Sequence, residues 1–287
     1  YFPWVGILEQ VQLSNIYVNY EDVQFSKGSF SNRVQVKTQS GIKWLTIPLK
    51  KLVLGQLINE VEIDYTTDWR KKHITTLNHA YSKASYKDEM IDLVEKVFEK
   101  KYVNLAELSN ASLMSLVQYF NLEKEKLFVD SSSLEIPGSS SQRVMEVCLK
   151  LNSHNYITGH GAKNYLDHEL FERNGIEVNY IDYGLSSYTQ AYGEFTPYVS
   201  ALDLVANCGK AGLSYINGSL RSWKDFILSN PGCQVSNLIV DKNLFIGLGG
   251  FDDCVIPSND KDFLMRALYF GYEYHVLKKN LVVCQLI

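Results

Sequence analysis

The sequence predicts an α/β fold with a mainly parallel sheet, flanking helices and one β-hairpin. Short segments rich in Val, Ile and Tyr alternate with longer amphipathic segments along most of the chain. This alternation is typical of parallel strands joined by crossover helices. One pair of strand-like segments is separated only by a short turn at Ser40 and Gly41, which indicates a hairpin. A small α/β segment is expected to follow residue 215.

The first part of the chain combines the hairpin with helices. Residues 32–38 alternate apolar and polar side chains, as a half-buried strand does. Asp68 precedes a helical segment and is expected to cap it. In order, the predicted elements are a helix over 4–13, strands over 15–25, 32–38, 42–49 and 61–63, and helices over 68–84, 88–101 and 113–120.

The second part of the chain returns to alternating strands and helices. Gly175 directly follows a helical segment, where a left-handed residue commonly ends a helix. A weak boundary near residues 215–219 separates a domain over 1–215 from a segment over 216–287. The predicted strands cover 126–130, 155–158, 176–183, 235–240 and 274–277, and the predicted helices cover 140–151, 164–174, 220–228 and 260–271.

The composition is that of a globular protein, with 46% hydrophobic and 21% charged residues in 287. The formal net charge of −4 shows no basic excess, so it gives no support to a nucleic-acid or anionic-membrane partner. No apolar run is long enough to predict a transmembrane helix. The five Cys lack the spacing of metal ligands, which predicts no metal site. Their low density within apolar segments predicts a reduced, cytoplasmic protein, which could work at the inner face of the membrane. Because the chain opens at Tyr1 without Met, we interpret it as an excerpt.

The hairpin carries the first set of candidate ligand-binding residues, namely Lys27, Asn32, Arg33 and Lys37. Arg33 and Lys37 stand four positions apart on a strand, so their side chains share a face. Such a basic face can hold a phosphate or a sugar carboxylate. The alternative is an ordinary solvated strand face.

Asp22 and Gln24 form a second candidate on the strand before the hairpin. At period two they point to the same face of that strand. They could orient sugar hydroxyls, and Asp22 could serve as a general base. The alternative is a polar pair at a strand end.

A glycine-containing loop, Gly159 to Lys163, follows a strand and is expected to open a helix. Gly159 and Gly161 would allow a ligand to approach the backbone, whose free N–H groups suit an anion. Lys163 would stand in the first turn, where the helix dipole does not favour a cation unless an anion is bound. The alternative is a tight turn without a ligand. We expect this loop and Arg33 to face a common cleft, since open α/β sheets bind ligands at strand ends.

Near the end of the chain, Asp260 stands at the start of a predicted helix, within an acidic cluster that Arg266 follows. A carboxylate in that position can act as a general base on a sugar hydroxyl. The alternative is simple capping of the helix.

Several motifs are similar to those of a known family. They run from Tyr1-Phe2-Pro3-Trp4-Val5-Gly6 through Tyr20 to Lys27, Asn32-Arg33, Trp44 to Pro48, Gly159 to Leu166, Tyr188 with Gln190, and Leu202-Asp203 to Asn207-Cys208-Gly209. On these residues the chain resembles the WbqC-like family over about residues 1–215. The family often has a His-Gln-Pro sequence, which would precede Tyr1, and a basic residue in place of Gly28. The resemblance implies a bacterial protein that serves the synthesis of O-antigen or another surface polysaccharide.

Residues 221–287 resemble the C-terminal half of an inverting family-two glycosyltransferase, which has a GT-A fold. The resemblance rests on Asn230-Pro231, Ser236 to Val240, Gly249-Gly250-Phe251-Asp252, Asp260, Asp262, Arg266 and Gly271-Tyr272. It implies that Asp260 deprotonates the acceptor hydroxyl. The nucleotide-binding half with its Asp-x-Asp metal motif is absent from this chain, so a divalent metal is implied only if that half exists elsewhere.

Together these observations predict a transferase that modifies or extends a sugar. Its expected ligand is an anionic sugar or a nucleotide-sugar donor, and its expected partners are polysaccharide-assembly enzymes. One alternative is a non-catalytic sugar-binding or scaffold partner of a glycosyltransferase. Another is a ligase or acyltransferase that attaches a group to a sugar.

Overall fold

The computed structural model of the chain describes residues 1–224, 238–240, 242–249, 263, 266–267, 273–277 and 281–285. The chain divides into two compact units, Tyr1–Leu220 and Arg221–Ile287. The predicted α/β class is confirmed, but the strands are distributed over several small sheets. No helix in the described part of the chain combines the length and apolar character that crossing a bilayer requires.

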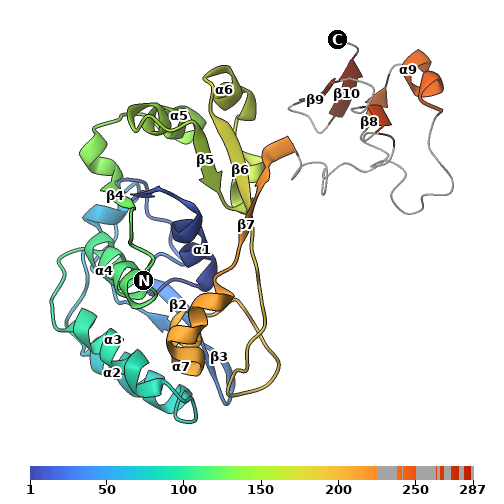
Figure 1. The fold of residues 1–287 in the computed structure, drawn as a ribbon. Coiled ribbons are helices and arrows are strands. Elements are labelled where there is room, and N and C mark those ends of the chain that lie inside the picture. Colours follow the sequence, from blue (N-terminus) through green and yellow to red (C-terminus); the bar gives the residue numbers. More distant parts are fainter. Residues whose placement is uncertain are drawn as a thin grey trace. The chain divides into compact units, whose positions relative to one another are not determined.

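Two small sheets organise the first part of unit 1. Strand β1 (Ile16–Asn19) pairs in parallel with β4 (Leu127–Asp130), so chain segments far apart in sequence lie side by side (Figure 1). The predicted hairpin is confirmed by β2 (Arg33–Thr38) and β3 (Gly41–Thr46), which pair antiparallel. Gly41 has φ +103°, a conformation that glycine adopts without strain and that lets the chain reverse direction there.

Four helices contribute a large part of the apolar core of unit 1 (Figure 1). The predicted cap is confirmed, since the Asp68 carboxylate accepts a hydrogen bond from the Lys71 amide at the start of α2. The buried faces of these helices contribute Leu8, Val11, Leu77, Val94 and Leu116. The helices are α1 (Val5–Leu13), α2 (Trp69–Ala80), α3 (Lys87–Phe98) and α4 (Leu105–Tyr119).

The rest of unit 1 follows the predicted alternation. Strands β5 (Asn155–Thr158) and β6 (Glu177–Asp182) pair in parallel and are joined through α6 (His168–Arg173), after which Gly175 has φ +70°. Strand β7 (Ser219–Ser222) is the third strand of this sheet, so the helix predicted over 220–228 is wrong at its start. Helix α5 (Ser140–Lys150) precedes β5, and α7 (Leu202–Cys208) follows the long segment over residues 183–199.

Unit 2 contains a three-stranded sheet in the order β8-β10-β9. Strand β10 (Leu281–Gln285) is parallel to β8 (Leu238–Val240) and antiparallel to β9 (Glu273–Leu277), and α9 (Lys242–Gly247) follows β8. The strand predicted over 274–277 is confirmed by β9. The candidate base Asp260 lies outside the described residues.

Candidate ligand site at the start of helix α1

The first turn of α1 holds the Trp4 ring in place. Trp4 is the extended residue that precedes the helix, and it forms an isolated β-bridge with Ser200. A Cβ atom on Gly6 would overlap the Trp4 indole, so the close approach of ring and backbone requires glycine there. The Ser200 amide donates a hydrogen bond to the carbonyl of Gln35 on β2 (2.8 Å). The start of α1 is thereby tied to the hairpin.

A small cavity of about 20 Å³ lies beside this turn, and we call it the Trp4 pocket. Aromatic rings from three segments line it, namely Trp4, Tyr188, Phe195 and Tyr215, together with the Glu9 side chain. The Tyr188 ring packs edge-on against Phe195 (5.1 Å between ring centroids) and Tyr215 (5.4 Å). Aromatic walls around a few polar groups are typical of small-molecule sites.

Of the described residues that line the Trp4 pocket, only Glu9 has a charged side chain. Its side chain is almost completely buried, and one carboxylate oxygen accepts hydrogen bonds from the amides of Gly184 (3.1 Å) and Asn217 (3.2 Å). Burial raises the pKa of Glu9, and the backbone N–H groups of Gly184, Asn217 and Gly218 only partly offset this effect. A carboxyl with a raised pKa beside a pocket can bind a hydrogen-bond donor or accept a proton.

A buried polar network supports the pocket from behind Tyr188. The Tyr188 hydroxyl and the Gln190 amide each donate to the same carboxylate oxygen of Asp203 (2.9 Å), as does the amide of Asn207 (3.2 Å). The Lys37 ammonium donates to the Gln190 side-chain oxygen (2.8 Å). Burial raises the pKa of Asp203, and its hydrogen bonds and the Lys37 charge partly offset that rise.

The structure therefore gives Lys37 a different setting from the one predicted. Lys37 is only 8% exposed, and its ammonium also donates to the Glu194 carbonyl next to Phe195. A buried ammonium with two protein acceptors supports the wall of the pocket rather than forming part of an open basic face.

The other ligand-binding residues predicted at or before the hairpin either contact neighbouring residues or are exposed. Arg33 does share a strand face with Lys37, but its guanidinium stacks over the Trp44 ring (4.2 Å) and donates to the Gly28 carbonyl. The Asn32 amide donates to the carbonyl of Ile47 (3.1 Å) and so ties the two hairpin strands together. Gln24 and Lys27 are exposed, and Gln24 bridges to Leu57.

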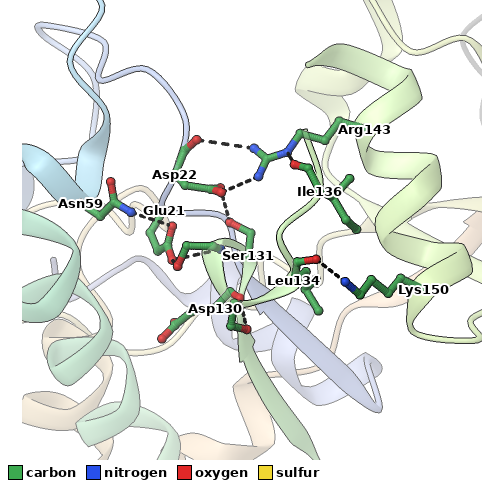
Figure 2. Close-up of polar contacts among 11 residues, drawn as sticks. Glu21, Asp22, Asn59, Asp130, Ser131, Leu134, Ile136, Arg143 and Lys150 are labelled. Carbon is green, nitrogen blue, oxygen red and sulfur yellow. Dashed lines mark hydrogen bonds and ion pairs between the residues drawn. The ribbon is translucent and has the colours of Figure 1, made fainter. Parts of the chain in front are cut away.

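The predicted base Asp22 lies in an ion pair (Figure 2). Its carboxylate accepts hydrogen bonds from the Arg143 guanidinium (2.5 Å) and the Ser131 hydroxyl (2.5 Å). Burial alone would raise the pKa of Asp22, but these hydrogen bonds and the Arg143 charge outweigh burial and lower it. A carboxylate held this way is a poor proton acceptor. The geometry favours the structural alternative for Asp22.

Hydrogen bonds of neighbouring side chains add to the Asp22–Arg143 ion pair (Figure 2). The Glu21 carboxylate accepts from the Ser132 hydroxyl and from the Asn59 amide (3.3 Å). The Arg143 Nε–H donates to the Ile136 carbonyl (2.9 Å). These contacts join the segment after β1 to the segment between β4 and α5.

The Gly159 loop also differs from the prediction. Residues His160–Asn164 form a 3-10 helix with Lys163 in its last turn, and α6 begins later with Asp167 as its cap. The loop therefore does not open an α-helix, and the expected conflict between Lys163 and a helix dipole does not arise.

Tyr183 explains the glycine at position 159. A Cβ atom on Gly159 would lie 2.7 Å from the Tyr183 hydroxyl, whereas one on Gly161 would meet nothing within 4 Å. The Tyr183 ring contacts both Trp4 (4.8 Å between ring centroids) and His160 (5.4 Å). The loop thus lies one side chain away from the Trp4 pocket, while Arg33 is engaged on the hairpin. A cleft shared by Arg33 and the loop stays a prediction.

Sequence reasoning missed Glu9 and Tyr183 as site residues. The available signal was the acidic Glu9 within an otherwise mostly apolar helical segment, because an acid on a buried face needs partners. Tyr188, Gln190 and Asp203 were noted only as part of the family resemblance. Within the described residues, no group of His, Cys, Asp and Glu side chains could hold a metal ion.

Comparison with known proteins identifies the family. The profile of the WbqC-like protein family matches residues 1–215. A relative, the uncharacterized protein Rv1507c of Mycobacterium tuberculosis (strain ATCC 25618 / H37Rv), is 31% identical over 219 residues, which cover 75% of this chain and 94% of the relative. No solved structure matches the chain. The resemblance of residues 221–287 to a glycosyltransferase stays a prediction, whereas the match over unit 1 shows that the chain belongs to the WbqC-like protein family.

Proposed function

We propose that this protein binds a sugar against the aromatic residues around the Trp4 pocket and acts as a transferase in the synthesis of a bacterial surface polysaccharide. The observation that carries the proposal is the aromatic pocket with one buried carboxylate, Glu9. Aromatic rings pack against the apolar C–H face of a sugar ring, and a carboxylate accepts hydrogen bonds from its hydroxyls. The assignment to surface-polysaccharide synthesis rests on the resemblance to the WbqC-like family.

In this proposal Glu9 takes the role that the sequence suggested for Asp22. A general base works best when its pKa lies near the working pH, and burial moves the pKa of Glu9 in that direction. The pKa of Asp22 is instead lowered, because Arg143 stabilises the charged form of that carboxyl. Asp260 remains a second candidate base for the segment over 216–287.

The nucleotide-sugar donor would place its phosphates outside the Trp4 pocket, because Glu9 would repel them. The Gly159 loop is a predicted anion site, and it contacts Tyr183, whose ring packs against Trp4. We place the reaction in the cytoplasm or at the inner face of the membrane, beside the polysaccharide-assembly enzymes. This location rests on the family resemblance and on the cysteine content.

A deletion of the gene in a bacterium that carries it tests the proposal. Wild-type protein should restore the polysaccharide, measured by its sugar composition and chain length, and Trp4→Leu or Glu9→Gln should not. The control is Glu95→Gln, which changes an exposed carboxylate on α3. Full restoration by both pocket variants would reject the Trp4 pocket as the site.

A non-catalytic sugar-binding partner is the second candidate function. The observation that favours it is that hydrogen bonds within the protein already engage Glu9 and Asp203. A binding module needs the aromatic walls but no base. Restoration by Glu9→Gln together with failure of Trp4→Leu would therefore favour this function over a transferase. A ligase or acyltransferase acting on a sugar would behave as the transferase does in this test.

A further inference from the structure

Strand β3 leaves part of the hairpin edge open. The amide of Ile47, which follows β3, donates to the carbonyl of Asn32, which precedes β2 (2.8 Å). Because hydrogen-bonded pairs alternate along an antiparallel ladder, the backbone groups of Ile42 and Trp44 point away from β2. In the described part of the chain the hairpin sheet has no third strand, and no backbone hydrogen bond reaches Ile42 or Trp44 from that side.

The continuation of this edge beyond β3 is covered. The Asp64 amide donates to the Pro48 carbonyl (2.9 Å). Closer to the strand, His73 of α2 forms a hydrogen bond with the Thr46 backbone. The open stretch is therefore short and is centred on Lys43.

Exposed apolar side chains gather beside the open stretch. Ile42 and Trp44 are both exposed and lie on one face of β3, since their positions differ by two. The Phe30 ring is 66% exposed and packs against the Trp44 ring (5.3 Å between ring centroids). We call Phe30, Ile42 and Trp44 the hairpin patch. A cluster of exposed apolar side chains marks an interaction surface more often than single ones do.

The charge around the hairpin patch is positive. Residues 23–59 contain six basic residues and no Asp or Glu, although the whole chain has a net charge of −4. Two of the six are engaged elsewhere, since Lys37 is buried and Lys50 forms an ion pair. Arg33 and Lys43 border the open stretch. This charge favours an acidic partner over a second copy of the chain, whose identical hairpin would bring like charges together.

We propose that β3 binds an extended acidic segment of a partner protein, which adds to the hairpin as a third strand. In antiparallel pairing the residue opposite Lys43 would be Asp or Glu, because opposite charges across strands attract. The residues on either side of it would form backbone hydrogen bonds with Ile42 and Trp44 and place apolar side chains against the hairpin patch. This inference does not depend on the proposed function, because the open edge and the Trp4 pocket involve different residues.

The competing explanation is that Lys43 only protects a short free edge. Lysine side chains and short strands are common means by which proteins keep an edge from pairing. A protected edge would accept no added strand, and a merely basic surface would bind any polyanion whatever its backbone. A decisive test therefore separates backbone pairing from charge.

The experiment selects short peptides from a random library displayed on phage, with the full chain as the target. We expect the selected peptides to share an acidic residue between two apolar ones. Fluorescence anisotropy then measures the affinity of a selected peptide. Methylation of the backbone nitrogens of the two apolar residues should weaken binding about tenfold, because hydrogen bonds to β3 are lost. Methylation of the nitrogen of the acidic residue, which points away from β3, should leave the affinity unchanged.

Two variants assign the binding to the edge of β3. Ile42→Pro removes an amide that points away from β2, so it should preserve the hairpin and weaken the peptide about tenfold. Lys43→Glu should weaken the peptide by about the same factor, because a repulsion across the strands replaces an attraction. Lys51→Glu is the matched control, since it changes an exposed lysine outside the strand by the same charge, and it should retain the affinity. Circular dichroism checks the fold of each variant, and the methylated peptides decide on the wild-type protein if a variant unfolds.

A library that yields no binding peptide would overturn the inference. Selected peptides that all bind folded Ile42→Pro and Lys43→Glu as tightly as the wild type would also overturn it, because their site would lie elsewhere. Dextran sulfate provides a polyanion without peptide groups. If it displaces the peptide and the methylated peptides bind as well as the unmodified one, the hairpin is a general polyanion site and strand addition is wrong.

Discussion

Asp22 and Arg143 form an ion pair in which the side chains are only 17% and 6% exposed. Removal of one partner from such a pair leaves a buried charge without compensation. We expect Arg143→Met to lower the free energy of unfolding by about 3–5 kcal/mol. Urea denaturation measures this change.

The surface pair Lys50–Glu62 provides the control, since its side chains are 59% and 51% exposed. Lys50→Met should leave the urea midpoint unchanged, because an exposed pair is screened by solvent. Equal effects of the two substitutions would contradict the structural role of Arg143.

The same ion pair predicts how stability depends on pH. The pKa of Asp22 is lowered in the folded state and returns to its ordinary value near 3.8 in the unfolded chain. The stabilisation is therefore present above that ordinary value and is lost as the pH falls through the lower folded value. We expect the stability difference between wild type and Asp22→Asn to shrink as the pH is lowered from neutral to about pH 3. Urea midpoints at several pH values measure it, and a constant difference would contradict the prediction.

Gly6 provides a test of the pocket wall at a single position. A methyl group there overlaps the Trp4 ring, so Gly6→Ala must displace the indole. We expect a loss of about 1–3 kcal/mol in the free energy of unfolding, the usual cost of overpacking, and a change in tryptophan fluorescence. Gly161→Ala is the control, because nothing lies within 4 Å of its added carbon. Unchanged fluorescence in Gly6→Ala would show that Trp4 does not rest on Gly6.

At the scale of elements, the segment over residues 183–199 forms one wall of the Trp4 pocket without regular secondary structure. The contacts of Lys37 with Gln190 and with the Glu194 carbonyl connect this segment to the hairpin. Long irregular loops that line a site are often functional, but they need fixed contacts to keep a defined shape.

The role of Lys37 can be measured by hydrogen exchange. Lys37→Met removes the charge-assisted hydrogen bonds to the segment and should cost about 1.5–3 kcal/mol of stability. We also expect faster amide exchange over residues 184–199. Lys43→Met is the matched control, since Lys43 is exposed and lies on the opposite face of the hairpin. Equal exchange in the two variants would show that Lys37 does not hold the segment.

At the scale of the whole molecule, the Trp4 pocket and its supporting network belong to unit 1, Tyr1–Leu220. The family match also falls within this unit. We expect a fragment over residues 1–224, which retains all of β7, to unfold cooperatively and to keep the sugar affinity of the full chain. Thermal denaturation and calorimetry test it. A fragment that is unfolded would show that unit 1 depends on residues 225–287.

The sequence by itself determined the local elements. Strand β5 has the predicted bounds, Asp68 caps α2 as expected, and the turn at Gly41 joins the predicted hairpin. Periodicity, capping residues and turn residues act over a few positions, so the sequence displays them directly. Local signals failed at β7, where a segment predicted to be helical joins a sheet whose other strands lie elsewhere in the chain.

Only the tertiary structure decided which side chains meet. Glu9 reaches the amide of Gly184, 175 residues away, and Arg143 pairs with Asp22 across 121 residues. No periodic pattern in the sequence indicates contacts between residues so far apart in the chain, because such contacts follow from the packing of the completed core. For this reason the sequence suggested Asp22 as a base, although packing gave that carboxylate a cationic partner and placed Glu9 in the pocket.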